Sequence, residues 1–175
     1  LYEISKKFKT TPEEAVMRLY EKSEGSFVLH SMEEEDVHEI AKYKNICVAS
    51  DGNSLRNTGP LSSGKPHPRS YGTNTRYLEN FVKEKKLVKL SDAIYRMTTL
   101  PAKRIGLKNR GEILKDYFAD INIFKLKDIK ENATYKNPHK YSKGMKYVFV
   151  NGKLSVQDGQ KLSGRYGRVI RSLVE

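Results

Sequence analysis

The chain has 175 residues, 37% of them hydrophobic, and a formal net charge of +12. No apolar run approaches the roughly 18 to 20 residues of a membrane span, and the start, "LYEISKKFKTTPEE", has no signal-peptide core, so the pattern favours neither a membrane protein nor an exported one. The single cysteine, Cys47, excludes an internal disulfide and a cysteine-based zinc ribbon, which predicts a protein of the reducing cytoplasm.

The positive charge bears on possible partners, because a basic surface attracts nucleic acid and anionic lipid without specificity. The lysines recur singly or in pairs, as in "KEKK" and "KYSKGMK", and no run of five or six basic residues occurs. This spacing is typical of a solvated surface and predicts no specific nucleic-acid partner and no membrane partner. A basic, non-enzymatic binding module nevertheless stays open as one hypothesis.

Two helices are predicted near the start of the chain. "TTPEEAVMRLYEKSEG" has Thr11 as its N-cap, Pro12 at the first helical position and Gly25 as its stop. "SMEEEDVHEIAKY" begins with Ser31 and Glu34 at the spacing of a capping box, and an apolar stripe follows.

An apolar run follows each helix and predicts a strand: "SFVLHS" at residues 26–31 and "NICVAS" at residues 45–50. The second lacks polar alternation, as expected of a strand covered on both faces in a parallel sheet. In doubly wound sheets and (β/α) barrels, the functional groups lie at the carboxyl ends of such strands. Asp51, followed at once by Gly52, stands at that end, so it is either a turn-former or a reagent.

The rest of the chain divides into a loop, helices and strands. Residues 52–73 are rich in Gly, Pro, Ser and Asn and predict a long loop, which in compact domains is usually functional or disordered. Helices are predicted at 74–86 and, from a Ser91 cap, at 91–100, with Pro101 opening a further turn that ends at Gly106. β-type patterns follow at 111–125 and 146–160, and Asn151-Gly152 within the second is a strong hairpin signal.

Several of these motifs together resemble one family. They are "SDG" at the end of the strand, "HPRSYGT", "MTTLPAKRIGLKNRG" followed by "ADINIF", "NPHKYSKGMKYVFVNG" and the closing "GRYGRVIR". These motifs are similar to the C-terminal part of the N-acyl-D-amino-acid deacylases, the D-aminoacylase branch of the amidohydrolase superfamily. The resemblance runs over nearly the whole chain. "HPRSYGT" combined with "NPHKYSKGMKYVFVNG" narrows it from the superfamily to the deacylase branch.

The resemblance implies an α/β fold class: the last two βα units of a metal-dependent-hydrolase TIM barrel plus the C-terminal strands of a small β-sandwich. The expected domains are residues 1–110 for the C-terminal part of the (β/α)₈ catalytic barrel, 111–164 for the sandwich strands and hairpin, and 165–175 for a tail returning to the barrel. On this interpretation the chain begins around the sixth helix of the barrel. Two parallel strands without their neighbours would expose edges, so the expected partners are the missing N-terminal barrel portion or a second copy of the chain.

The resemblance also implies roles for two residues. Asp51 would take a proton from metal-bound water and pass it to the leaving amine, which a carboxylate within hydrogen-bond reach can do. Arg69, in "HPRSYGT", would bind the α-carboxylate of an N-acyl-D-amino acid, because a guanidinium is a bidentate fork suited to a carboxylate. The alternatives are that Asp51-Gly52 only makes a turn and that Arg69 only holds the loop.

The remaining candidate ligands do not match the zinc site that the resemblance implies. The chain has no His-x-His pair; His30 ends a predicted strand, His38 is expected to face out of a charged helix, and His67, between two prolines, is expected to shape the loop. Cys47 is expected to be a small buried apolar residue. The interpretation is therefore a zinc-dependent hydrolase as the full-length protein, with no metal ligand, no zinc and no hydrolysis from this chain alone.

The function predicted from the sequence is hydrolysis of the amide bond of N-acyl-D-amino acids to a carboxylate and a free D-amino acid. A second hypothesis is another amidohydrolase of hydantoinase or dihydroorotase type, against which "HPRSYGT" argues. The third is the basic, non-enzymatic module introduced above.

Overall fold

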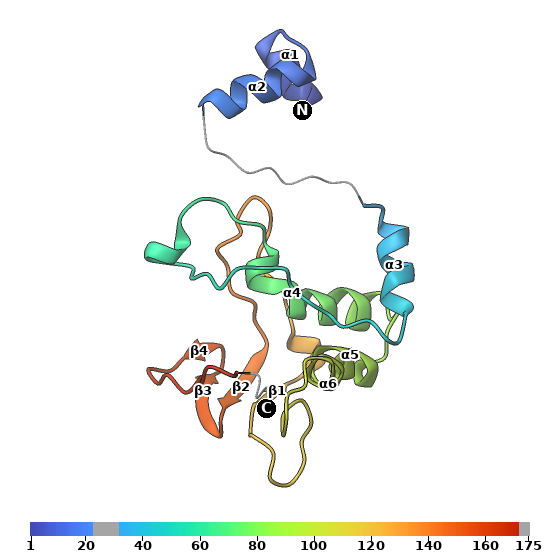
Figure 1. Ribbon diagram of the computed structural model, residues 1–175, viewed down its shortest axis with the longest axis vertical. Helices are drawn as coiled ribbons and strands as arrows, with labels where there is room; N and C mark the ends of the chain where they lie inside the picture. Colours follow the sequence, from blue (N-terminus) through green and yellow to red (C-terminus); the bar gives the residue numbers. More distant parts are fainter. Residues whose placement is uncertain (23–31, 172–175) are drawn as a thin grey trace. The chain divides into compact units, whose positions relative to one another are not determined.

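The structure is a computed structural model that describes residues 1–22 and 32–171 (Figure 1). The chain divides into two compact units, residues 1–32 and 33–175. The predicted strand at 26–31, the helix stop at Gly25 and the cap at Ser31 lie outside the described residues. No helix in the described part of the chain is long and apolar enough to cross a bilayer.

The first unit contains α1, Tyr2–Phe8, and α2, Pro12–Lys22. The predicted start of α2 is confirmed, because the Thr11 hydroxyl oxygen accepts a hydrogen bond of 3.3 Å from the Glu14 N–H, the bond that an N-cap threonine makes. Ala15 and Ser5 are the buried residues of this pair of helices.

The second unit opens with α3, Glu34–Lys42, where a helix is predicted. The segment after it differs from the prediction: residues 46–50 form no strand, and the only sheet among the described residues is antiparallel. A parallel strand requires neighbouring strands for its ladder, and the described residues supply none. This segment is instead held by a 3.1 Å hydrogen bond from the Val48 N–H to the Arg96 carbonyl oxygen.

A second group of helices follows the long loop, which contains the short turn η1, Pro60–Ser62. It comprises α4, Arg69–Tyr77; the π-helical segment η2, Leu78–Glu84; α5, Leu90–Met97; and α6, Thr99–Arg104. These helices carry most of the core, whose buried members are Leu78, Val82, Val88, Ala93 and Ile129.

The four-stranded antiparallel sheet has the order β1-β2-β3-β4, with β1 at Ile121–Phe124, β2 at Met145–Val150, β3 at Lys153–Gln157 and β4 at Gln160–Lys161 (Figure 1). The turn η3, Leu126–Asp128, follows β1 and contacts η2. Phe124, Leu126 and Met145 pack against the buried residues of the helices, so the sheet and helices share one core.

The predicted Asn151-Gly152 hairpin is confirmed between β2 and β3. Both residues have positive φ angles, 48° and 77°, as the tight hairpin turns of this type require. The turn also binds neighbouring segments: the Asn151 N–H donates to Asp120 Oδ1 (2.8 Å), and Asn151 Nδ2 donates to the Tyr166 carbonyl oxygen (2.6 Å). The Gly152 N–H donates to the Ala119 carbonyl oxygen at 2.9 Å.

Candidate active site

The two predicted site residues, Asp51 and Arg69, lie together. One guanidinium nitrogen of Arg69 is 3.0 Å from Asp51 Oδ2, and the two side chains are 44% and 86% exposed. Asp51 has a positive φ of 48°, in the left-handed region where Asp and Asn are the favoured non-glycine residues. The pair therefore presents an accessible carboxylate and a partly accessible guanidinium side by side at the surface.

Arg69 is the first residue of α4, so the loop ends at residue 68 and the prediction that it extends to residue 73 is wrong. Pro68 explains the earlier helix start, because its ring fixes φ near the helical value, and its carbonyl oxygen accepts bonds from the N–H groups of Tyr71 and Gly72. The ring of His67 shapes this entry, since its Nδ1 accepts a 3.0 Å hydrogen bond from the Arg69 N–H.

A glycine allows the Asp51 segment to lie against the start of α4. A Cβ added at Gly52 would lie 2.9 Å from Ser70 Cα and 3.1 Å from the Arg69 carbonyl oxygen, both of them backbone atoms. The Ser70 hydroxyl oxygen then accepts a 3.2 Å hydrogen bond from the Asn53 N–H. The residue after Asp51 is thus a glycine for a steric reason beyond turn formation.

An aromatic cluster joins the site to a distant part of the sequence. The rings of His67 and Tyr135 lie 4.9 Å apart, and the ring of Tyr71 lies 5.7 Å from that of His139 and 6.0 Å from that of Tyr141. These contacts bring "HPRSYGT" and "NPHKYSKG" together. The sequence singled out both motifs through the family resemblance, but no periodicity or spacing predicted that they would meet.

Burial, together with the neighbouring Tyr141, raises the pKa of Tyr71 above its ordinary value. The Tyr71 hydroxyl therefore keeps its proton at neutral pH, and it donates a 2.8 Å hydrogen bond to the Arg56 carbonyl oxygen in the long loop.

The other candidate ligands are scattered. The His38 side chain is only 25% exposed and packs edge-on against Phe81, so the prediction that it faces outward is wrong. Cys47 is a free, half-buried cysteine. Nε2 of His139 is buried without a hydrogen-bond partner among the described atoms. Residues 1–22 and 32–171 contain no group of three or more His, Cys, Asp or Glu side chains that could hold a metal ion.

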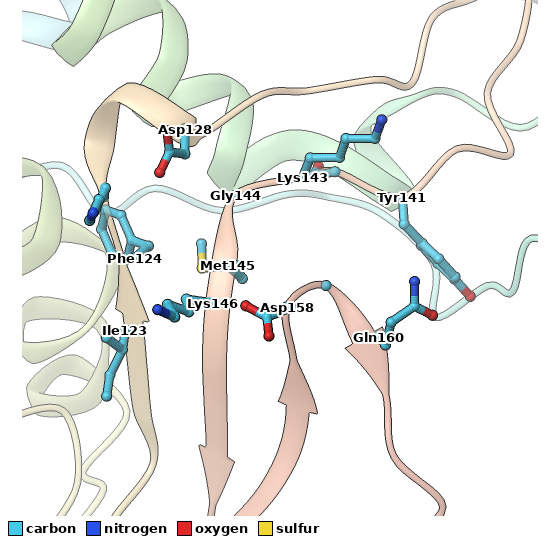
Figure 2. Close-up of a pocket in the computed structure, with 13 residues that line it drawn as sticks. Ile123, Phe124, Asp128, Tyr141, Lys143, Gly144, Met145, Lys146, Asp158 and Gln160 are labelled. Atoms are coloured by element: carbon cyan, nitrogen blue, oxygen red, sulfur yellow. The ribbon is translucent and has the colours of Figure 1, made fainter.

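A separate pocket of about 600 Å³ lies where the strand ends meet residues 141–144 and the turn at 158–160 (Figure 2). Its charged lining consists of Lys125, Asp128, Lys143, Lys146 and Asp158. Asp51 and Arg69 do not line it, so the candidate site and this pocket are distinct features of the unit.

The sequence matches the amidohydrolase family over residues 51–156, a range that contains Asp51, Arg69 and most of the sheet. The chain belongs to the amidohydrolase family.

Similar curated proteins come from Alcaligenes xylosoxydans xylosoxydans. An N-acyl-D-aspartate deacylase is 35% identical over 140 residues, which are 79% of this chain and 26% of that protein. An N-acyl-D-glutamate deacylase is 35% identical over 82% of this chain and 28% of its own length. A D-aminoacylase is 34% identical over 79% of this chain and 27% of its own length. The chain thus spans about a quarter of the length of these relatives.

Solved structures agree in fold. A crystal structure of N-acyl-D-glutamate deacylase from Bordetella bronchiseptica, complexed with zinc and a phosphonate inhibitor, matches with a TM-score of 0.82 at 31% identity. The match covers 98% of this chain and 34% of that one. A D-aminoacylase crystal structure matches with a TM-score of 0.71 at 32% identity, covering 79% of this chain and 28% of that one.

Proposed function

We propose that the chain is the C-terminal part of a zinc-dependent deacylase that hydrolyses N-acyl-D-amino acids to a carboxylate and a free D-amino acid. The observation that carries the proposal is the 3.0 Å approach of Arg69 to Asp51. It sets a potential proton acceptor beside a potential carboxylate receptor in a chain that belongs to the amidohydrolase family. The named relatives and the solved neighbours, which are deacylases, support this choice of substrate class.

In this proposal Asp51 carries the proton. As water adds to the acyl carbon and the amide C–N bond breaks, the Asp51 carboxylate accepts the water proton and returns it to the leaving nitrogen. Its 86% exposure leaves it accessible to water and to a substrate amide.

Arg69 binds the α-carboxylate of the substrate. A guanidinium has five N–H donors, so one nitrogen can stay on Asp51 while the others hold a second carboxylate. The same arrangement would fix the distance between the substrate carboxylate and the proton carrier, which favours one position of the scissile amide.

The described residues do not fit a zinc site, because they bring together no group of three or more potential ligands. When bound, zinc supplies Lewis-acid activation of the amide and of water. We propose that its ligands come from a barrel portion outside this chain. In the same proposal, residues 1–110 complete the barrel, residues 111–164 supply strands of the sandwich, and residues 165–175 return to the barrel. The chain alone then associates with the missing barrel portion or with a second copy of itself.

A chimera tests the function. The segment of the Bordetella bronchiseptica N-acyl-D-glutamate deacylase that this chain matches is replaced by this chain, and zinc content and hydrolysis of N-acetyl-D-glutamate are measured. We expect zinc-dependent, D-selective hydrolysis. Asp51→Asn should lower kcat by about 10²- to 10⁴-fold, the usual contribution of a general acid–base group. Asn tolerates the positive φ of 48°, so this substitution removes the charge without backbone strain.

The matched control is Asp158→Asn. Asp158 also precedes a glycine and has a φ of 47°, but it lies in the turn between β3 and β4. If Asp51-Gly52 were only a turn, the two variants would behave alike, and equal kcat values would refute the role of Asp51. A zinc-loaded chimera that leaves N-acetyl-D-amino acids intact would refute the proposed function itself.

A further inference from the structure

The beginning of the long loop lies along the first turn of α4 through successive contacts. Asp51 pairs with Arg69 at 3.0 Å, and the Asn53 N–H donates to Ser70 Oγ at 3.2 Å. The next contact is made by Tyr71, whose hydroxyl donates to the Arg56 carbonyl oxygen. Each contact lies further along both segments. We call this row of contacts the seam, and the Asp51–Arg69 pair is its first contact.

Two tyrosine hydroxyls hold the far end of this seam at a single peptide group. The Tyr71 hydroxyl donates to the Arg56 carbonyl oxygen at 2.8 Å, and the Tyr141 hydroxyl oxygen accepts from the Asn57 N–H at 3.2 Å. The C=O of residue 56 and the N–H of residue 57 belong to one planar peptide unit and point to opposite sides of the chain. The two tyrosines therefore hold that peptide from both sides and fix its plane.

Tyr141 is itself held in place. Its carbonyl oxygen accepts a 2.9 Å hydrogen bond from Asn132 Nδ2, and the hydroxyl of the next residue, Ser142, lies 2.5 Å from Thr75 Oγ1 of α4. The side chain of Pro138, in the same segment, is fully buried. The backbone at Tyr141 and Ser142 is thus tied to Asn132 and to α4, although Tyr141 itself is 50% exposed.

We propose that Tyr71 and Tyr141 are positioning residues for the Asp51–Arg69 pair, acting through the peptide group between Arg56 and Asn57. The consequence for catalysis rests on the proposed function; the positioning itself does not. Removing either hydroxyl frees one side of the peptide and loosens the seam, so that Asp51, which the loop carries, moves relative to Arg69, which is fixed at the start of α4. The expected loss therefore falls on proton transfer by Asp51 more than on binding of a ligand carboxylate.

The first measurement is amide hydrogen exchange of the 175-residue chain by NMR, for the wild type, Tyr141→Phe and a Tyr43→Phe control. Tyr43 follows α3 and is 68% exposed. Loss of one hydrogen bond of about 1 kcal/mol should speed exchange of the Asn57 amide about fivefold in Tyr141→Phe. If the seam loosens toward Asp51, exchange of the Asn53 amide, which donates to Ser70 Oγ, should rise as well, and that of no core amide. The control should leave exchange unchanged. Unchanged exchange at Asn53 in Tyr141→Phe overturns the positioning role, whatever the activity.

The second measurement separates positioning from general structural support. In the chimera described above, Tyr141→Phe and Tyr71→Phe should each lower kcat for N-acetyl-D-glutamate about three- to tenfold with KM within about twofold, the size of one lost hydrogen bond. Effects on kcat should be non-additive with those of Asp51→Asn, because both changes act on the same carboxylate. Additive effects, or a rise in KM alone, would overturn the proposal. An inactive wild-type chimera with faster Asn53 exchange in Tyr141→Phe would refute the deacylase function and leave the positioning role supported.

Discussion

Replacement of Gly144 by alanine tests how the sheet is joined to the core. Gly144 immediately precedes β2 and has a φ of 101°, where side chains other than glycine are strained. An added Cβ would lie 2.6 Å from the Asp128 carbonyl carbon and 2.7 Å from Ile129 Cα. Both are backbone atoms, so no side-chain rotation relieves the clash, and Ile129 is fully buried.

The expected loss combines two terms. A non-glycine residue in such a region costs about 1–3 kcal/mol, and overpacking against a core costs about 1–3 kcal/mol. The sum, about 2–6 kcal/mol, is a large part of the about 5–15 kcal/mol that stabilises a typical domain. We therefore expect Gly144→Ala to lower the urea midpoint of unfolding strongly or to prevent folding.

Gly159→Ala is the control, because Gly159 also has a positive φ, 75°, but an added Cβ meets no atom within 4 Å. It should lose only the backbone term of about 1–3 kcal/mol. Urea unfolding of the two variants, followed by circular dichroism, gives the difference. Equal losses would show that close approach to Asp128 and Ile129 contributes nothing, and the steric reasoning would be wrong.

Two further outcomes are expected. Arg96 is 3% exposed, and its guanidinium donates to the carbonyl oxygens of Ala41 and Lys42. Arg96→Met should leave these acceptors unpaired and lower the free energy of unfolding by about 1–3 kcal/mol. An unchanged melting temperature would contradict this expectation. Burial alone would raise the pKa of Glu79, but hydrogen bonds from Lys130 and a backbone N–H outweigh it and hold the pKa below its ordinary 4.5. The stabilisation by Glu79 is therefore present above about pH 4.5 and is lost as the pH falls through the lowered pKa of the folded state. Glu79→Gln should reduce the loss of stability on the acid side of a profile of unfolding free energy measured over roughly pH 3 to 7. An unaltered acid side would refute this expectation.

Local signals in the sequence predicted local structure well. The Thr11 cap and the Asn151-Gly152 hairpin were both predictable because each depends on residues within a few positions of one another. The segment at 46–50 could not be settled in this way, since an apolar run becomes a strand only where neighbouring strands pair with it.

The candidate site illustrates a different limit. Glycine and proline content predicted a loop after Asp51, but not that Pro68 would start a helix at Arg69 or that this helix would bring the guanidinium to the carboxylate. The family resemblance identified both residues. It assigned no role to Tyr141, whose contact with the loop depends on the folding of segments far apart in the sequence.

The Asn151-Gly152 turn has a consequence for the order in which the chain folds. Tight hairpins form within about 1–10 μs, faster than contacts that close long loops. Once the turn has formed, its backbone N–H groups and the Asn151 side-chain amide are in place to donate hydrogen bonds to Ala119, Asp120 and Tyr166. We therefore expect the β2–β3 hairpin to form early in folding. Strand β1 and the segment near Tyr166 should then pair with it later.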